Sequence, residues 1–185
     1  IVEDIQVLPA GTYATIKEGH FRLEKYWKPV VSSGAHDYGS YEDVCNTVHD
    51  LLLRSVQKRL VADVPFGAFL SGGIDSSTIV GLMSRTLDKP VSTFSVTFDE
   101  DNFSEASYAK MIAQKFQTKH HDLRLKIKDF LDELPLALSS LDFPSGDGPN
   151  TFVVSRATKK AGITMALSGL GGDELFAGYP IFKQS

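Results

Sequence analysis

From residue 41 onward, short apolar runs alternate with stretches in which apolar residues recur every three or four positions. The runs are typical of buried strands and the recurring stretches are typical of amphipathic helices. Strands that alternate with helices predict an α/β fold with a doubly wound, mostly parallel sheet. The predicted strands cover 66–70, 91–98, 121–125 and 164–167, and the predicted helices cover 41–61, 74–87, 104–116, 127–138 and 151–160.

The first 40 residues have a different pattern. Apolar and polar side chains alternate in short runs near 5–8, 13–16 and 21–23, with glycine-containing turns between them. This pattern predicts two or three short N-terminal β-strands. Residues 32–40 are rich in Ser and Gly, as a linker would be, so we expect one unit over 1–40 and a second over 41–185.

Composition excludes several classes of protein. With 185 residues, 42% of them hydrophobic and 23% charged, the chain can bury a real core, and neither disorder nor a coiled coil is expected. The net charge of -4 is unlike that of a nucleic-acid binder. No apolar run is long enough for a membrane helix, no signal peptide is recognisable, and a single Cys fits a reducing compartment, so we expect a cytoplasmic protein with no membrane partner.

The single cysteine excludes an internal disulfide and any zinc site built from cysteines. Cys45 falls on the apolar stripe of the predicted helix 41–61, so we expect it in the core and not in catalysis. His120 and His121 are adjacent on a predicted strand, where their side chains point to opposite faces, so joint metal ligation is not expected. Four aromatic residues at core periods are assigned no cofactor role: Phe94, Phe98, Phe116 and Phe130.

A glycine-rich turn, Ser71–Ser77, lies between a predicted buried strand and a helix. Glycines let the backbone turn tightly with N–H groups facing a ligand, and the helix N-terminus adds partial positive charge. Asp75 would repel an anion unless a cation intervened, and Mg²⁺ fits because it prefers carboxylate and phosphate oxygens. The alternative is an ordinary helix capped by Ser and Asp.

A second glycine-rich turn, Ser168–Glu174, follows the last predicted strand. Ligands of doubly wound sheets bind beyond the carboxyl ends of the strands, where both turns fall. If the two strands are neighbours, Asp75 and Asp173 could meet over one pyrophosphate. Helix capping by Asp173 and Glu174 is the alternative.

The string SGGIDSS resembles the pyrophosphate-binding loop of the N-type ATP pyrophosphatases. Paired with SGLGGDELFAGY, it resembles the synthetase domain of glutamine-hydrolysing asparagine synthetase and its relatives, and the resemblance covers about 41–185. It implies an adenine nucleotide alpha hydrolase-like, Rossmann-like sheet. Residues 1–40 resemble the end of an upstream domain and a linker, and 41–185 the N-terminal part of a synthetase domain truncated at its C-terminus.

The resemblance implies an ATP-dependent ligase with Mg²⁺. A substrate carboxylate, aspartate in the asparagine-making relatives, attacks the α-phosphate of ATP and forms an acyl-adenylate and pyrophosphate, and ammonia released from glutamine then forms an amide. Asp75 and Asp173 would be catalytic and would hold the metal, and Val96 would contact adenine. The implied ATP and pyrophosphate site comprises Leu70, Ser71, Gly72, Gly73, Asp75, Ser76, Ser77, Val96, Ser168 and Gly169.

Leu170 departs from the family pattern, because asparagine-making relatives commonly carry Glu at that place. Two alternatives therefore stay open: an adenylating relative that acts on another carboxylate, and a non-catalytic nucleotide-binding module. The glutaminase domain of the family would lie upstream of Ile1 and further synthetase residues beyond Ser185, so this chain alone is expected to be inactive. The resemblance also allows a homodimer.

Overall fold

The computed structural model describes residues 3–28, 39–98, 106–143 and 145–183. It divides into two compact units, Ile1–Ser40 and Tyr41–Ser185.

The first unit contains an antiparallel hairpin. Strand β1 (Thr12–Lys17) pairs with β2 (His20–Lys25), with Thr12 opposite Lys25 and Lys17 opposite His20. Two of the two or three predicted N-terminal strands are therefore present; the alternating residues 5–8 are described and form no strand, because alternation alone does not make a strand without a partner. The linker predicted at 32–40 lies outside the described residues except for its last two.

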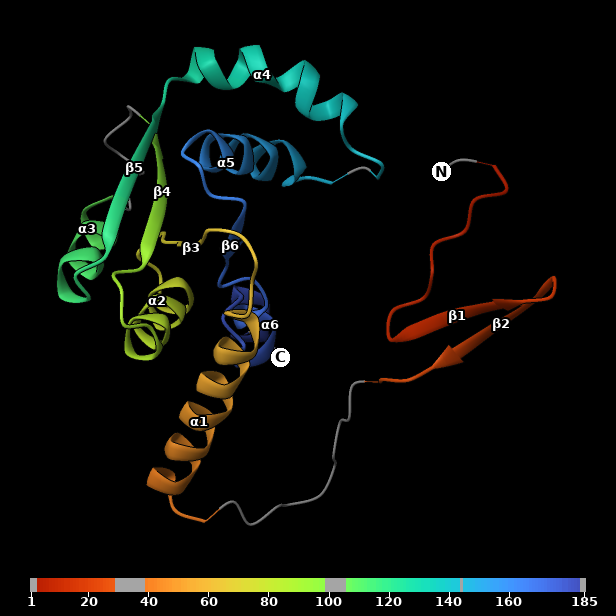
Figure 1. The fold of residues 1–185 in the computed structure, drawn as a ribbon, viewed down its shortest axis with the longest axis horizontal. Helices are drawn as coiled ribbons and strands as arrows, with labels where there is room; N and C mark the ends of the chain where they lie inside the picture. Colours follow the sequence, from red (N-terminus) through yellow and green to blue (C-terminus); the bar gives the residue numbers. More distant parts are fainter. Residues whose placement is uncertain (1–2, 29–38, 99–105, 144, 184–185) are drawn as a thin grey trace. The chain divides into compact units, whose positions relative to one another are not determined.

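The second unit alternates helices and strands, as the sequence predicts (Figure 1). Its elements are α1 (Tyr41–Arg59), β3 (Phe66–Phe69), α2 (Ile74–Thr86), β4 (Ser92–Phe98), α3 (Ala106–Lys115), β5 (Lys119–Leu125), α4 (Ile127–Ser139), α5 (Gly148–Lys160), β6 (Met165–Leu167), α6 (Gly172–Phe176) and a 3₁₀ helix (Pro180–Lys183).

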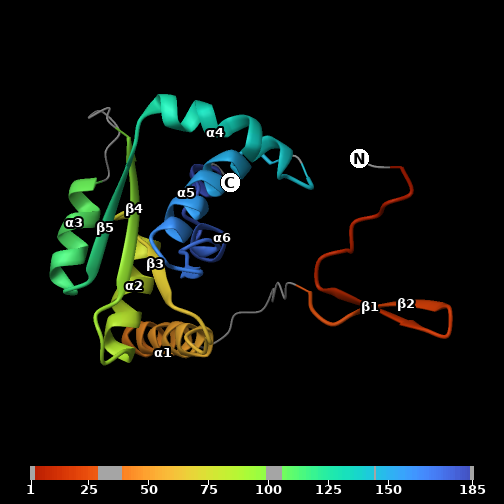
Figure 2. The same ribbon diagram turned by 45° about the horizontal axis from the view of Figure 1, so that its top comes forward.

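The four strands β5, β4, β3 and β6 form one sheet in that order, and every pair is parallel. The chain moves from β3 outward to β5 and then returns to place β6 on the other side of β3. Figures 1 and 2 show α3 on one side of β4 and β5 and α5 on the other. The prediction of a doubly wound α/β fold is therefore confirmed, and strand order reverses between β3 and β6, the kind of point where such sheets bind ligands.

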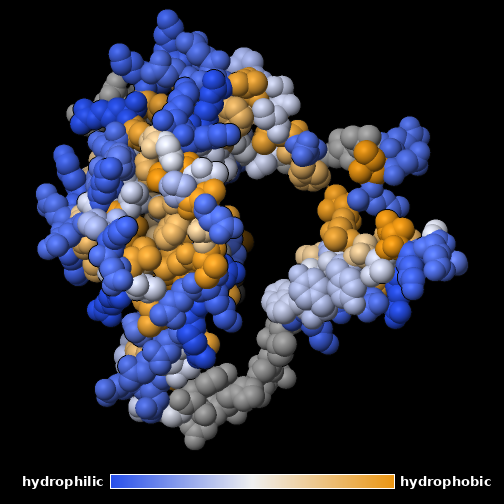
Figure 3. Space-filling model, viewed as in Figure 1, coloured by the Kyte–Doolittle hydropathy of each residue, from blue (hydrophilic) through white to orange (hydrophobic). Residues whose placement is uncertain are grey.

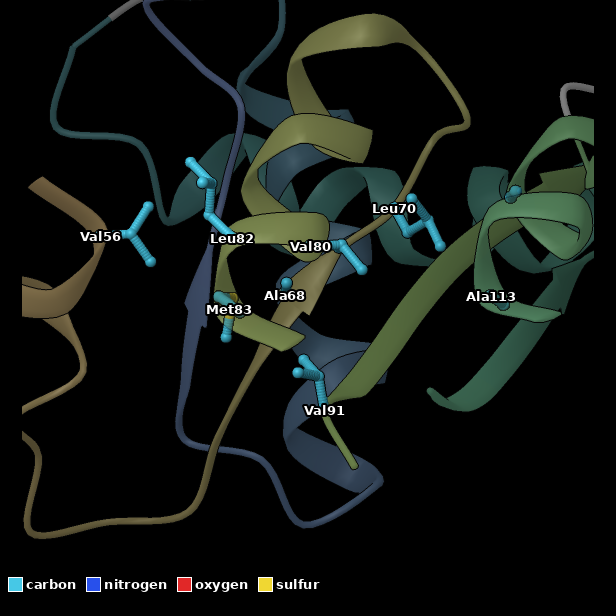
Figure 4. Close-up of a cluster of buried hydrophobic side chains, with 9 residues drawn as sticks. Val56, Ala68, Leu70, Val80, Leu82, Met83, Val91 and Ala113 are labelled. Atoms are coloured by element: carbon cyan, nitrogen blue, oxygen red, sulfur yellow. The ribbon is translucent and has the colours of Figure 1, made fainter. Parts of the chain in front are cut away.

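The core lies where α1, α2 and α3 pack on one face of the sheet (Figure 4). Val80 and Met83 of α2 and Leu70 after β3 are almost completely buried. Close packing of this kind holds the carboxyl end of β3, and with it the turn that follows, in a fixed position.

The prediction for Cys45 is wrong, because its side chain is exposed. Tyr41 and Leu51 of the same predicted stripe are exposed as well, whereas Val56 is buried. The reason is that the described residues by which α1 packs on the buried cluster lie in its C-terminal half, from Leu52 to Val56.

Helix α5 begins at Gly148, three residues before its predicted start. Pro149 does not prevent the earlier start, because proline is tolerated in the first turn of a helix, where its missing N–H has no partner to lose. The helix therefore brings Asp147 to its N-terminal end.

The structure describes most of the aromatic side chains at core periods and both adjacent histidines. Phe94 is buried, and Phe116 and Phe130 are half-buried; the side chain of Phe98 lies outside the described part. His120 Nδ1 lies 3.0 Å from Thr93 Oγ1, and the His121 ring stacks on Phe94 at 4.8 Å. The two histidines therefore serve different contacts.

No group of three or more His, Cys, Asp or Glu side chains among the described residues could hold a metal ion. None of the helices described is both long and apolar enough to pass through a membrane.

Apolar side chains also remain on the surface of the second unit. Figure 3 shows them gathered over the region of β3, β6 and α6. The exposed apolar residues of the second unit include Leu170, Leu175, Phe176 and Ile181.

Candidate functional site

The two glycine-rich turns leave the sheet side by side. Strand β3 pairs with β6 in parallel, with Phe66 opposite Met165 and Ala68 opposite Leu167. Because parallel neighbours end at the same edge of a sheet, Ser71–Ser77 and Ser168–Glu174 emerge together at the point where strand order reverses. The strands that precede Asp75 and Asp173 are therefore neighbours, as a shared site of the two carboxylates requires.

The first turn depends on Gly72 and on two serine side chains. Gly72 has a φ of +88°, and a Cβ there would lie 2.6 Å from the Cβ of Tyr108 in α3, so a larger residue cannot make this turn unchanged. The Ser71 and Ser76 hydroxyl groups lie 2.9 Å apart, and the Gly73 N–H donates to Ser71 Oγ over 3.2 Å. These bonds fix the strand-to-helix turn that begins α2.

The second turn lies directly against Asp75. A Cβ on Gly172 would lie 2.0 Å from Asp75 Oδ2, so the Asp75 carboxylate fits only because Gly172 has no side chain. A Cβ on Gly169 would lie 2.8 Å from the Ser76 nitrogen. The structure therefore brings Asp75 of the first turn against the residue that precedes Asp173 in the second.

Tyr179 connects to the same carboxylates. Its hydroxyl donates to Glu174 Oε1 over 2.9 Å. The hydrogen bond to Glu174, some loss of solvent, and the negative charges of Glu174, Asp173 and Asp75 raise the pKa of the Tyr179 hydroxyl above its ordinary value. Three carboxylates therefore act on one phenol. Tyr179 lies at the end of the second motif but was not among the predicted site residues.

A cavity of about 780 Å³ opens beside these turns, between the ends of β3, β4 and β6 and the first turns of α5. Four of the predicted site residues line it: Leu70, Ser71, Val96 and Ser168. Asp147, Asn150, Thr151, Ser155 and Leu170 line it too.

The remaining predicted residues are distributed around the turns. Gly72 and Ser77 line a separate groove of about 440 Å³ between α2 and α3. The Ser77 hydroxyl is buried and has no hydrogen-bond partner in the described part of the chain. Gly73 caps α2, and Asp75 and Ser76 lie in its first turn.

A larger cavity of about 930 Å³ lies elsewhere, between β5, α4 and α5. Its wall includes an ion pair in which Arg156 donates to Glu133 over 2.6 Å. None of the residues predicted from the two turns lines it, so the candidate site is the cavity at the strand ends.

Comparison with known families gives this geometry a context. The sequence model of the family described as asparagine synthase matches residues 47–185, which contain both turns and the cavity. The chain belongs to the asparagine synthase family. The resemblance that the two motifs carry is therefore confirmed at the level of the family.

Curated members of the asparagine synthase family agree in sequence. A Methanocaldococcus jannaschii protein named putative asparagine synthetase [glutamine-hydrolyzing] 2 is 43% identical over 132 residues, which are 70% of this chain and 25% of that protein. Asparagine synthetase [glutamine-hydrolyzing] 1 of Bacillus subtilis is 33% identical over 183 residues, which are 97% of this chain and 28% of that protein. The chain thus spans about a quarter of the length of these two relatives.

A solved structure was matched as well. The NH3-dependent NAD synthetase from Campylobacter jejuni aligns with a TM-score of 0.49 and 14% identity, over 72% of this chain and 60% of that chain.

Proposed function

We propose that this asparagine synthase family chain forms the nucleotide-binding part of a ligase that activates a carboxylate with ATP and converts it to an amide. Aspartate is the proposed acid and ammonia from glutamine the proposed nitrogen source, since the similar proteins are named glutamine-hydrolyzing asparagine synthetases. A glutaminase domain is the proposed partner within the whole enzyme.

One observation carries the proposal. The two motif turns lie side by side at the reversal of strand order, and Asp75 lies against Gly172, next to Asp173. Because such a reversal opens a crevice at the strand ends, an ATP molecule has room beside both turns. We place its adenosine near Leu70 and Val96, in the cavity of about 780 Å³, and its phosphates toward the turns.

The residues present also fit a Mg²⁺ ion. Mg²⁺ keeps several waters and is usually held by one or two carboxylates together with substrate phosphates. Two protein carboxylates are therefore enough for a Mg²⁺ site. Gly172 leaves room for the Asp75 carboxylate. Asp75 and Asp173 would hold the ion, which would supply positive charge against the phosphate oxygens.

The chain's own groups have a defined part in the proposed reaction. The carboxylate of the substrate attacks the α-phosphate, and negative charge builds on the leaving pyrophosphate. Fixed N–H and hydroxyl groups of Ser71–Ser77 would stabilise that charge, because donors held in place by a folded turn need no reorganisation as it develops. Ammonia would then displace AMP to leave the amide.

Isothermal titration of the chain with ATP in Mg²⁺ tests the proposal. We expect binding, and a loss of about 10- to 100-fold in affinity in Asp75→Ala, as for other lost interactions with a charged group. Asp88→Ala, an exposed carboxylate after the end of α2, is the matched control and should bind normally. No binding, or equal binding by Asp75→Ala, would contradict the proposal.

The substrate is tested in an enzyme of the relatives' full length that carries this sequence. We expect L-aspartate to stimulate the exchange of pyrophosphate into ATP. Stimulation by a different acid and not by aspartate would support the alternative in which another carboxylate is activated. Leu170, which is 89% exposed at the cavity and brings no charge to it, is the reason for testing that alternative.

A further inference from the structure

The cavity at the strand ends contains one ionisable side chain among its described lining residues, and that side chain is Asp147. The other lining residues of the described chain are apolar or carry neutral hydroxyl and amide groups. Asp147 immediately precedes α5, on the wall of the cavity that α5 forms, and its side chain is exposed. A ligand group that reaches this wall therefore meets a negative charge.

Two neighbours on α5 hold the Asp147 carboxylate. Asn150 Nδ2 donates to Asp147 Oδ1 over 3.2 Å, and Thr151 Oγ1 donates to Asp147 Oδ2 over 2.9 Å. Each bond uses one lone pair of an oxygen that has two, so the carboxylate is oriented and can still accept further hydrogen bonds. All three residues line the cavity.

The charge of Asp147 is unfavourable for the ligands proposed so far, since ATP and the substrate carboxylate are both anions. A fixed carboxylate in an anion site is compensated when the ligand itself carries a cation. An ammonium group suits this wall, because it has three N–H donors and carboxylate, hydroxyl and amide oxygens are all acceptors. Ser155, one turn further along α5, adds a hydroxyl to the same wall.

We propose that Asp147, held by Asn150 and Thr151, binds the α-ammonium group of the acid substrate and so selects an amino acid over a plain carboxylic acid. The inference rests on the proposed function, whose carboxylate-activating step it deepens. Asp147 would touch the substrate directly, whereas Asn150 and Thr151 are positioning residues. Recognition by one charge-assisted contact also orients the substrate, because a single CH2 group separates the carbon that carries the ammonium from the reacting carboxylate.

The test compares L-aspartate with succinate, which lacks only the amino group, in ATP–pyrophosphate exchange by an enzyme of the relatives' full length. In Asp147→Asn we expect KM for L-aspartate to rise about 10- to 100-fold while KM for succinate is unchanged or falls. Asp132→Asn, an exposed carboxylate on α4 outside the cavity lining, should leave both values unchanged. Thr151→Val removes one supporting bond and should raise KM for L-aspartate severalfold with little change in kcat.

Each outcome decides between the two proposals. Equal use of succinate and L-aspartate by the parent enzyme, or an equal effect of Asp147→Asn on both acids, would overturn the inference and leave the proposed function standing. If Asp147→Asn fails to fold, an unchanged preference for L-aspartate in a folded Thr151→Val variant would overturn it. Exchange with neither acid would overturn the proposed function and this inference with it.

Discussion

At the scale of single residues, Gly172 is where the two turns depend on each other most directly. A Cβ at this position would lie 2.0 Å from Asp75 Oδ2, which is far shorter than a contact between non-bonded carbon and oxygen atoms. We expect Gly172→Ala to displace the Asp75 carboxylate and to lower the affinity for ATP with Mg²⁺ about tenfold or more, with the fold retained. Isothermal titration measures the affinity, and circular dichroism checks the fold.

The matched control is Gly146→Ala. Its added Cβ would have no heavy atom within 4 Å, and its backbone is not in the left-handed region, so no strain is introduced. Equal ATP affinity in Gly172→Ala and Gly146→Ala would show that the position of Asp75 does not matter for binding.

At the same scale, the two sequence motifs do not indicate every residue that lies near the strand ends. SGGIDSS and SGLGGDELFAGY point to glycines, serines and aspartates, and the structure places those residues at adjoining strand ends. Tyr179 is the last residue of the second motif, and its hydrogen bond to Glu174 joins residues only five apart. Asp147 lies before α5, outside both motifs, and reaches the cavity through tertiary packing that the motifs do not encode. The close approach of Gly178 to Asp173, with a would-be Cβ 1.8 Å from Oδ1, was equally invisible in the sequence.

At the scale of elements, the pair β4–β5 contains a polar chain that couples stability to pH. Thr93 Oγ1 lies 2.8 Å from Thr118 Oγ1 and 3.0 Å from His120 Nδ1. Burial lowers the pKa of His120, Asp122 opposes this shift, and His121 and Lys110 add to it. In the unfolded chain His120 has the ordinary pKa of about 6.5, so it binds a proton more readily than it does in the folded chain.

The sign of the pH effect follows from that difference. Stability is fully present above about pH 6.5 and falls as the pH drops toward the lowered folded-state pKa. Urea unfolding at pH 5.5 and 7.5 should show a small fall for the parent chain and a smaller one for His120→Gln. The exposed His49→Gln serves as control, and an unaltered fall in His120→Gln would contradict the role of His120.

Elements were predictable where packing agrees with periodicity. Every helix and strand expected between residues 41 and 167 is present, because each has an apolar face that the sheet or a neighbouring helix covers. Periodicity alone is insufficient: the alternating residues 5–8 form no strand in the described structure, and Cys45 is exposed although it falls on the apolar stripe of α1. The order of β5, β4, β3 and β6 could not be read from the sequence, since it is set by contacts between strands far apart in the chain.

At the scale of the whole molecule, every residue of the proposed site comes from the second unit, Tyr41–Ser185. The buried apolar cluster that supports the turns lies in that unit as well. We therefore expect a chain of residues 41–185 to fold and to bind ATP with Mg²⁺ within about twofold of the parent affinity, which is less than 0.5 kcal/mol. Binding should stabilise both chains alike, by about 2.7 kcal/mol when ATP is at 100 times its dissociation constant.

Thermal unfolding with and without ATP and Mg²⁺ measures this stabilisation, and AMP, which lacks the phosphates that the turns would hold, is the ligand control. A rise in melting temperature that disappears when residues 1–40 are removed would place part of the site in the hairpin unit. A rise as large with AMP as with ATP would show that the two turns do not hold the β- and γ-phosphates. A rise that both chains share, that needs ATP and that Gly172→Ala weakens would connect the reversal of strand order between β3 and β6 to nucleotide binding.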